Sequence, residues 1–158
     1  MKSKFLAIII VAIIAVIALG AAFTLCLGSN GEPSDSSSWE VRELSGIKFK
    51  VPQKHESENM LSGNIIDGVK TGDMYQSEDL TISINDTNWT SELNKFMNTD
   101  SNSMTVLDAN GTKIKTFSAD GTSVAFFEIN KNKIAVNWSG DINGDIKAII
   151  FSFFQENK

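Results

Sequence analysis

The chain has one cysteine and one histidine among its 158 residues. With Cys26 as the single cysteine, no disulfide can form within the chain. Imidazole acid–base chemistry or a zinc site would have to depend on His55 alone. Glu56 and Glu58 supply carboxylates beside it, but the surrounding stretch is polar and we predict an exposed loop there.

Catalytic and metal-binding motifs are also missing. The chain has no Gly-x-Ser-x-Gly motif, and its glycines are dispersed instead of forming a phosphate-binding loop. Asp141–Asp145 offers oxygen ligands at alternate positions, but Ile146 and Ser152 stand where an EF-hand has its glycine and glutamate. We interpret this stretch as a turn and helix cap. The sequence predicts no catalytic, cofactor-binding or metal-binding residue, and a protein that is not an enzyme.

Arginine is nearly absent as well. The net charge is −5, and Arg42 is the single arginine. Phosphate-binding surfaces favour the guanidinium fork of arginine, and nucleic acid attracts basic proteins. We therefore expect no nucleic-acid partner.

A long apolar segment stands out against these absences. It runs from Phe5 to Leu27 without a charge and follows Lys2 and Lys4. As a helix it would be about 34 Å long, enough to cross a hydrocarbon core of about 30 Å. Because positive charge stays on the cytoplasmic side, we predict that residues 1–4 are cytoplasmic and that residues 5–27 form a transmembrane signal-anchor. The protein is then a single-pass protein of the cell membrane with its C-terminal domain outside the cytoplasm.

Two alternatives for this segment remain open. A secretory signal could be cleaved after a small-x-small site such as Ala18–Gly20 or Gly20–Ala22, although apolar residues continue to Leu27. Cys26 could be lipidated, since its context loosely resembles a bacterial lipobox, although Leu25 stands where a small residue is expected.

Two regions follow the apolar segment. Residues 28–38 are Gly, Ser, Asn, Glu, Pro and Asp, with no apolar side chain to bury, which predicts a flexible tether. Residues 39–158 are enough for one domain that closes a core without metal or disulfide. We expect this domain to be extracytoplasmic.

The domain alternates between strand and helix patterns. Apolar residues alternate with polar ones at 47–51 and 80–84, which predicts strands, and a weaker extended stretch spans 65–75. Residues 53–63 are polar. Apolar residues at helical spacing over 89–97, after cap residues at 86–88, predict a short amphipathic helix.

The second half of the domain predicts two hairpins and a final helix. One hairpin joins Thr105–Leu107 to Thr112–Phe117 through Asn110-Gly111, and the other joins Ser123–Ile129 to Lys133–Trp138. Residues 146–154 fit both helix and strand, and the stripe over three turns favours helix. The fold class is α+β, an antiparallel sheet covered on one face by the middle and C-terminal helices.

This order of elements carries a resemblance. The strand Gly46–Pro52, the helix after a mid-chain strand, the two hairpins and the terminal helix Asp145–Phe154 resemble small membrane-anchored exported proteins of archaea. In outline they also resemble the PsbP-like fold, over residues 39–158. Members of that superfamily serve as accessory subunits, lipoproteins and binding modules, so the resemblance implies no shared active site.

Four N-glycosylation sequons occur, at Asn85, Asn88, Asn110 and Asn137. The abundance of asparagine, serine and threonine accounts for about this many by chance. We predict that Asn110, in a hairpin turn, is the most accessible and that Asn137, inside a strand, is the least.

Aromatic residues give the remaining candidate site. Trp89 and Trp138 lie on apolar stripes, where core packing is the usual outcome, but with Phe151 and Phe154 they could also form a surface. An exposed surface would dock on cell-envelope proteins, as in a non-enzymatic interaction or accessory module. Alternatively, the aromatic residues line a pocket, and the domain carries lipid or another apolar ligand.

Overall fold

A computed structural model describes residues 32–55, 59–66, 69–98 and 103–158 of the protein. In these residues the fold is α+β, with antiparallel sheets and two α helices. The predicted transmembrane segment 5–27 lies outside the described residues. Neither of the two α helices in the described residues has the length and hydropathy of a membrane span.

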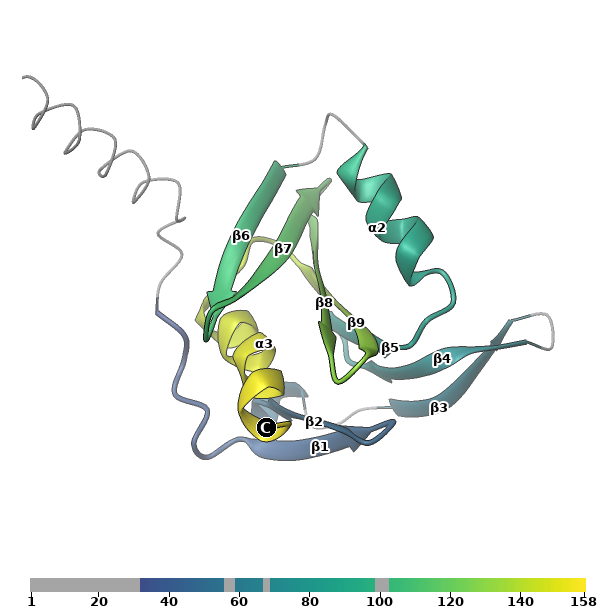
Figure 1. The fold of residues 1–158 in the computed structure, drawn as a ribbon. Helices are drawn as coiled ribbons and strands as arrows, with labels where there is room; N and C mark the ends of the chain where they lie inside the picture. Colours follow the sequence, from purple (N-terminus) through teal and green to yellow (C-terminus); the bar gives the residue numbers. More distant parts are fainter. Residues whose placement is uncertain (1–31, 56–58, 67–68, 99–102) are drawn as a thin grey trace, which may run out of the picture.

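The strands form two sheets, in which every neighbouring pair is antiparallel. A hairpin of two strands stands apart from a seven-stranded sheet with the order β3-β4-β5-β9-β8-β7-β6 (Figure 1). The hairpin strands are β1 (Glu40–Leu44) and β2 (Ile47–Val51), and the sheet strands are β3 (Asn59–Ile66), β4 (Val69–Gln76), β5 (Leu80–Ile84), β6 (Ser103–Ala109), β7 (Thr112–Ala119), β8 (Thr122–Ile129) and β9 (Asn132–Ser139).

Tight two-residue turns connect the strands from β6 to β9. Both residues of each turn have positive φ, for example 53° and 85° at Asn110–Gly111, as the favoured hairpin turns require. The two predicted hairpins are thus confirmed, although the second turn is Asn130–Lys131, and Asn132 already pairs with Ile129. A third turn, Asp120–Gly121, joins them into one four-stranded meander.

Other strand predictions have mixed outcomes. The predicted strands at 47–51 and 80–84 are confirmed as β2 and β5. The polar stretch 53–63 contains a 3-10 helix, Gln53–His55, and the start of β3, and residues 56–58 of the loop predicted around His55 lie outside the described residues. The extended stretch 65–75 belongs to two strands, β3 and β4.

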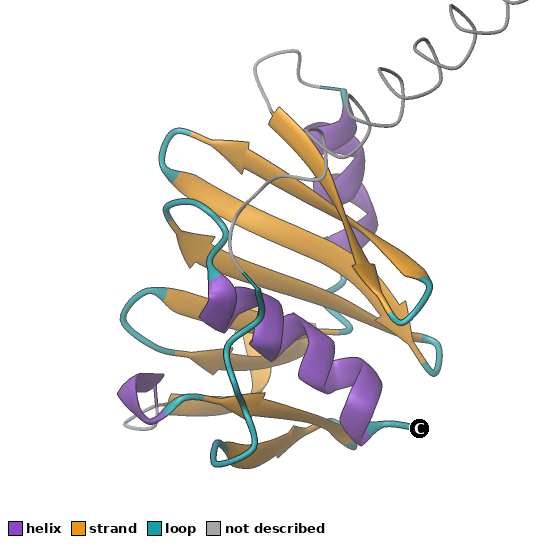
Figure 2. Ribbon diagram, turned by 90° about the vertical axis from the view of Figure 1, so that its left-hand side faces the viewer, coloured by secondary structure: helices purple, strands orange, loops and turns teal. Residues whose placement is uncertain are grey.

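Both predicted helices are present, as α2 (Trp89–Met97) and α3 (Gly144–Glu156). The prediction that they cover one face of the sheet is wrong, since they lie on opposite faces (Figures 1 and 2). Consecutive β8 residues point to opposite faces, so Phe126 packs with Trp89 of α2 and Phe127 packs with Phe153 of α3. The central strands are therefore buried on both sides.

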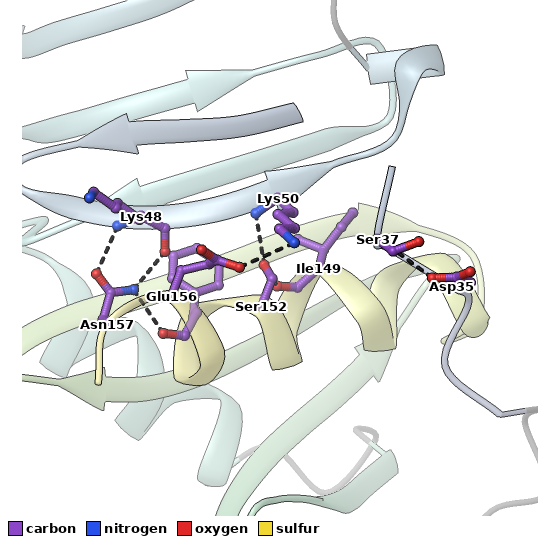
Figure 3. Close-up of polar contacts among 9 residues, drawn as sticks. Asp35, Ser37, Lys48, Lys50, Ile149, Ser152, Glu156 and Asn157 are labelled. Carbon is purple, nitrogen blue, oxygen red and sulfur yellow. Dashed lines mark hydrogen bonds and ion pairs between the residues drawn. The ribbon is translucent and has the colours of Figure 1, made fainter. Parts of the chain in front are cut away.

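α3 connects the hairpin β1–β2 to the main sheet. The rings of Phe49 in β2 and Phe153 in α3 stack with their centroids 5.0 Å apart, and Phe49 also meets Tyr75 of β4 edge-on at 5.5 Å. This helix also covers the outer edge of β2 (Figure 3). The Asn157 side chain accepts a hydrogen bond from the Lys48 amide and donates one to its carbonyl, at 2.9 and 2.6 Å.

Part of the predicted tether contacts the domain. The Ser34 amide donates to the Gly144 carbonyl at 2.9 Å, and its hydroxyl donates to the Asp145 carboxylate at 2.6 Å. A Cβ on Gly144 would lie 2.8 Å from the carbonyl oxygen of Glu32, so the glycine permits this close approach. The ordered contacts of the domain thus begin before Trp39.

Candidate interaction surface

The four aromatic residues singled out in the sequence do not form one surface. Trp89 is 7% exposed and packs on the α2 face, whereas Trp138 is 3% exposed and belongs to the core on the α3 face. Phe151 and Phe154 are partly exposed and pack against that same core. Both tryptophans are therefore core residues, as their positions on apolar stripes predict.

The Trp89 indole fixes α2 to the sheet. Its Nε1 donates to the Ile134 carbonyl at 2.9 Å, its ring meets Phe126 edge-on, and the Lys133 ammonium lies 5.2 Å from the ring centroid. Further along α2, Phe96 contacts Phe117 of β7 and Phe126 of β8, each at 5.8 Å between centroids. α2 thus spans β9, β8 and β7 through its aromatic side chains.

The four sequon asparagines differ in accessibility. Three of them are exposed, Asn85, Asn88 and Asn110, and Asn137 is partly buried in β9. Asn110 is thus more accessible than Asn137, as predicted. The Asn85 amide nitrogen already donates to the side-chain oxygen of Asn132 at 2.8 Å. Glycosylation itself stays a prediction.

The polar candidates of the sequence have structural roles. Asn143 is the N-cap of α3, since its side chain accepts from the Ile146 amide at 3.0 Å. The Asp145 carboxylate accepts from Ser34 and pairs with the Lys54 ammonium at 2.6 Å. Among the described residues, no three His, Cys, Asp or Glu side chains gather as a metal site would require.

Two open concavities on the described surface are lined mostly by small and polar residues. One, of about 440 Å³, lies at the Asp120–Gly121 turn and is lined by serine, glycine, threonine, alanine and aspartate. The other, of about 270 Å³, includes Ser45 and Asp73, whose side chains are hydrogen-bonded to each other. Neither has an aromatic side chain in its lining.

Exposed apolar side chains gather instead where α2 meets the end of the sheet. Met97 is 50% exposed, Met104 is 56% exposed and Val106 is 36% exposed. Met104 lies opposite Phe117 in the strand register, and Val106 lies opposite Lys115, whose ammonium is 3.8 Å from the Met97 sulfur. We call Met97, Met104, Val106 and Lys115 the β6 surface.

The β6 surface lies beyond the ring contacts that the structure describes for α2. Phe96 of α2 contacts Phe117 of β7 and Phe126 of β8, while Met104 and Val106, on the same face of β6, stay exposed in the described part of the chain. The other face of β6 is covered, because Leu107 and Ala109 are buried in the α3 core. This exposure could not be predicted from the sequence, since Met104 and Val106 alternate with polar residues as in any half-buried strand.

Charge on the β6 surface is unbalanced. The Lys113 ammonium beside Asp108, at 2.5 Å, holds the pKa of that carboxyl below its usual range, and the Gly111 amide adds to the effect. Asp108 is thus satisfied within its own hairpin. Lys115, by contrast, has no carboxylate partner among the described residues, and its ammonium rests on the Met97 sulfur.

Comparison with family models, with curated proteins and with solved structures gives no significant match to this chain. The resemblance to the PsbP-like fold therefore remains a prediction from the order of the elements.

Proposed function

We propose that the protein is a non-enzymatic interaction or accessory module, anchored in the cell membrane by residues 5–27 and acting outside the cytoplasm on envelope proteins. The observation that carries the proposal is the β6 surface. Three adjoining apolar side chains, all at least one-third exposed, border the end of the sheet where no described element covers them. Clustered exposed apolar residues of this kind are typical of protein contact sites.

The anchor rests on the sequence. The uncharged segment Phe5–Leu27 after Lys2 and Lys4 supports a single span with the domain outside. An accessory role is also what the PsbP-like resemblance implies. A tether of a few residues would keep the domain within reach of neighbouring membrane proteins.

The alternative, a carrier of lipid or another apolar ligand, has less support. A carrier needs a largely apolar pocket that buries most of its ligand. The aromatic residues that could line one are packed against each other, as in the contacts of Phe127 with Phe153 and Phe154. The two concavities described above are open to solvent and have no aromatic side chain in their lining.

Crosslinking in intact cells tests the proposal. A photo-crosslinking amino acid is placed at Met104, on the β6 surface, or at Lys131, an exposed turn residue at the far end of β9. We expect discrete protein crosslinks from position 104 and few from position 131. Crosslinks to lipid alone from position 104, or equal protein crosslinks from both positions, would contradict the module. Protease digestion of the domain in right-side-out vesicles tests the orientation in the same cells.

A further inference from the structure

β6 is an edge strand with a free row of backbone groups. It pairs with β7 on one side, and no described strand pairs with the other. Because Asn110–Gly111 is a two-residue turn, Ala109 and Thr112 form the hydrogen-bonded pair that closes the hairpin. Counting back along β6, the amides and carbonyls of Met104, Val106 and Asp108 therefore point away from β7.

The same count of backbone groups from a two-residue turn agrees with the hydrogen bonds of another hairpin in the molecule. In the hairpin β1–β2, the turn Ser45–Gly46 assigns the outward backbone groups of β2 to Lys48 and Lys50. Those groups do bond outward, to Asn157 and Ser152 of the α3 segment. The edge of β2 is thus capped by side chains, whereas no described residue bonds the outward groups of β6.

The β6 edge has few of the usual devices against strand addition, since its one charged side chain, Asp108, pairs with Lys113 of the neighbouring strand. Ser103–Ala109 contains no proline and no lysine, and its register with β7 runs without a bulge. Native edge strands are commonly blocked by such features. Here the free backbone groups adjoin the exposed side chains of Met104 and Val106, so an added strand would meet both hydrogen-bonding groups and apolar surface.

The charge of the surface specifies the occupant. We propose that the β6 edge binds an extended segment of a partner protein as an eighth strand, with an acidic side chain opposite Val106 that pairs with Lys115. An added strand would lie two strand spacings, roughly 10 Å, from β7. A glutamate on the added strand and Lys115 on β7 are together long enough to meet above Val106. An apolar side chain opposite Met104 would cover the rest of the surface. This inference rests on the proposed function and names the partner's chemistry.

A second copy of the chain fits this site less well. Pairing two β6 strands antiparallel about Val106 places valine opposite valine, and Asp108 of each copy opposite Met104 of the other. Pairing them about Leu107 places Asp108 of one copy opposite Val106 of the other, but then only the turn residue Asn110 comes opposite Met104, where an apolar side chain is needed. Asp108 is already paired with Lys113. Both Lys115 side chains would then lack a carboxylate, and the protein as a whole carries a net charge of −5 that repels its own copies.

Selection from a library of displayed random heptapeptides tests the proposal, with the full chain in lipid nanodiscs as bait and empty nanodiscs as counter-selection. We expect enriched peptides with an apolar residue two positions from an acidic one. The order Glu-x-apolar along the peptide indicates antiparallel addition, and apolar-x-Glu indicates parallel addition. The enriched peptides are then synthesised with a fluorophore, and their affinities are measured by anisotropy.

Two variants and two matched controls locate the binding. Val106→Pro removes an outward amide and leaves the β6–β7 ladder intact, and Val41→Pro makes the same change at an outward position on β1. Lys115→Glu reverses the proposed contact, and Lys131→Glu makes the same charge change at a distant turn. We expect Val106→Pro and Lys115→Glu each to weaken binding at least about tenfold. The controls stay within about twofold, as surface changes far from a contact do.

Exchanging the charges of Lys115 and of the peptide's acidic residue keeps the test valid if Val106→Pro disturbs the fold. Replacing the peptide's acidic residue by lysine should abolish binding to the parent chain and restore it to Lys115→Glu. The proposal is overturned by enriched peptides that lack an acidic residue, by equal binding to the two variants Val106→Pro and Lys115→Glu and to their controls, or by no enrichment at all. A dimer of the parent chain that Val106→Pro dissociates would overturn it in favour of a second copy. If crosslinks from position 104 persist in that variant, the edge inference fails and the interaction module stands.

Discussion

The two buried tryptophans differ in a single polar atom. Trp89 Nε1 donates to a carbonyl, whereas Trp138 Nε1 is buried with no acceptor among the described residues. A buried donor without a partner costs free energy that a bonded one does not. Trp138 therefore contributes to the core through its apolar ring alone, while Trp89 also orients α2 on the sheet.

We predict that Trp89→Phe destabilises the domain more than Trp138→Phe. Both changes remove the same atoms, but the first also loses the bond to Ile134 and leaves a buried carbonyl less satisfied. The free energies of unfolding, from urea titrations, should differ by about 1 kcal/mol or more. An equal loss, or a larger loss from Trp138→Phe, would show that the Nε1 bond contributes nothing measurable.

At the scale of elements, the attachment of α3 to β2 depends on a few polar contacts. Ser152 is fully buried, and its hydroxyl accepts from the Lys50 amide at 2.8 Å and donates to the Ile149 carbonyl at 2.6 Å. The Lys50 ammonium also pairs with Glu156, one turn further along the helix, at 3.2 Å. These contacts close an edge that would otherwise be open (Figure 3).

We predict that Ser152→Ala lowers the free energy of unfolding by about 1–2 kcal/mol, because the Lys50 amide loses its acceptor inside the protein. Hydrogen exchange at that amide should accelerate in parallel. Ser139→Ala, at an exposed serine, is the control and should change stability by less than about 0.5 kcal/mol. Unchanged protection of the Lys50 amide would contradict the assigned role.

Elements with a regular pattern of apolar residues could be predicted from the sequence, and those whose conformation depends on their partners could not. β2 and β5 show alternation, and α3 shows a stripe over three turns, so their types were correct. β1 was missed because four of its five side chains are not fully buried, and its pairing with β2 decides its conformation.

The prediction that both helices cover one face of the sheet was wrong for a different reason. Residues 124–127 are four consecutive apolar residues in β8, the pattern of a strand buried on both faces. That pattern already argued against two helices on one face. The β6 surface could not be predicted, because the position of β6 at the end of the sheet depends on the long-range pairing of β5 with β9.

At the scale of the whole molecule, α3 unites two sheets that share no hydrogen-bonded strands. The hairpin β1–β2 and the seven-stranded sheet meet through the packing of Phe49, Phe153 and Tyr75. α2, on the opposite face, covers only the smaller cluster around Phe117 and Phe126. Removal of α3 would therefore separate the hairpin from the sheet and expose the larger core.

We predict that residues 32–158 fold as a soluble domain without metal or disulfide, and that a chain ending at Asn143 does not. Ile146, Ile149, Ile150 and Phe153 are nearly fully buried. Burial of each side chain contributes about 1.5–3 kcal/mol to stability. Together the four contributions are as large as the whole free energy of unfolding of a typical domain, roughly 5 to 15 kcal/mol. A chain ending at Glu156 is the control, since it keeps these side chains and loses only the Asn157 contacts. Thermal melts followed by circular dichroism should show a cooperative transition for the control and none for the shorter chain. A cooperative melt of the shorter chain within a few degrees of the parent would show that the core closes without α3.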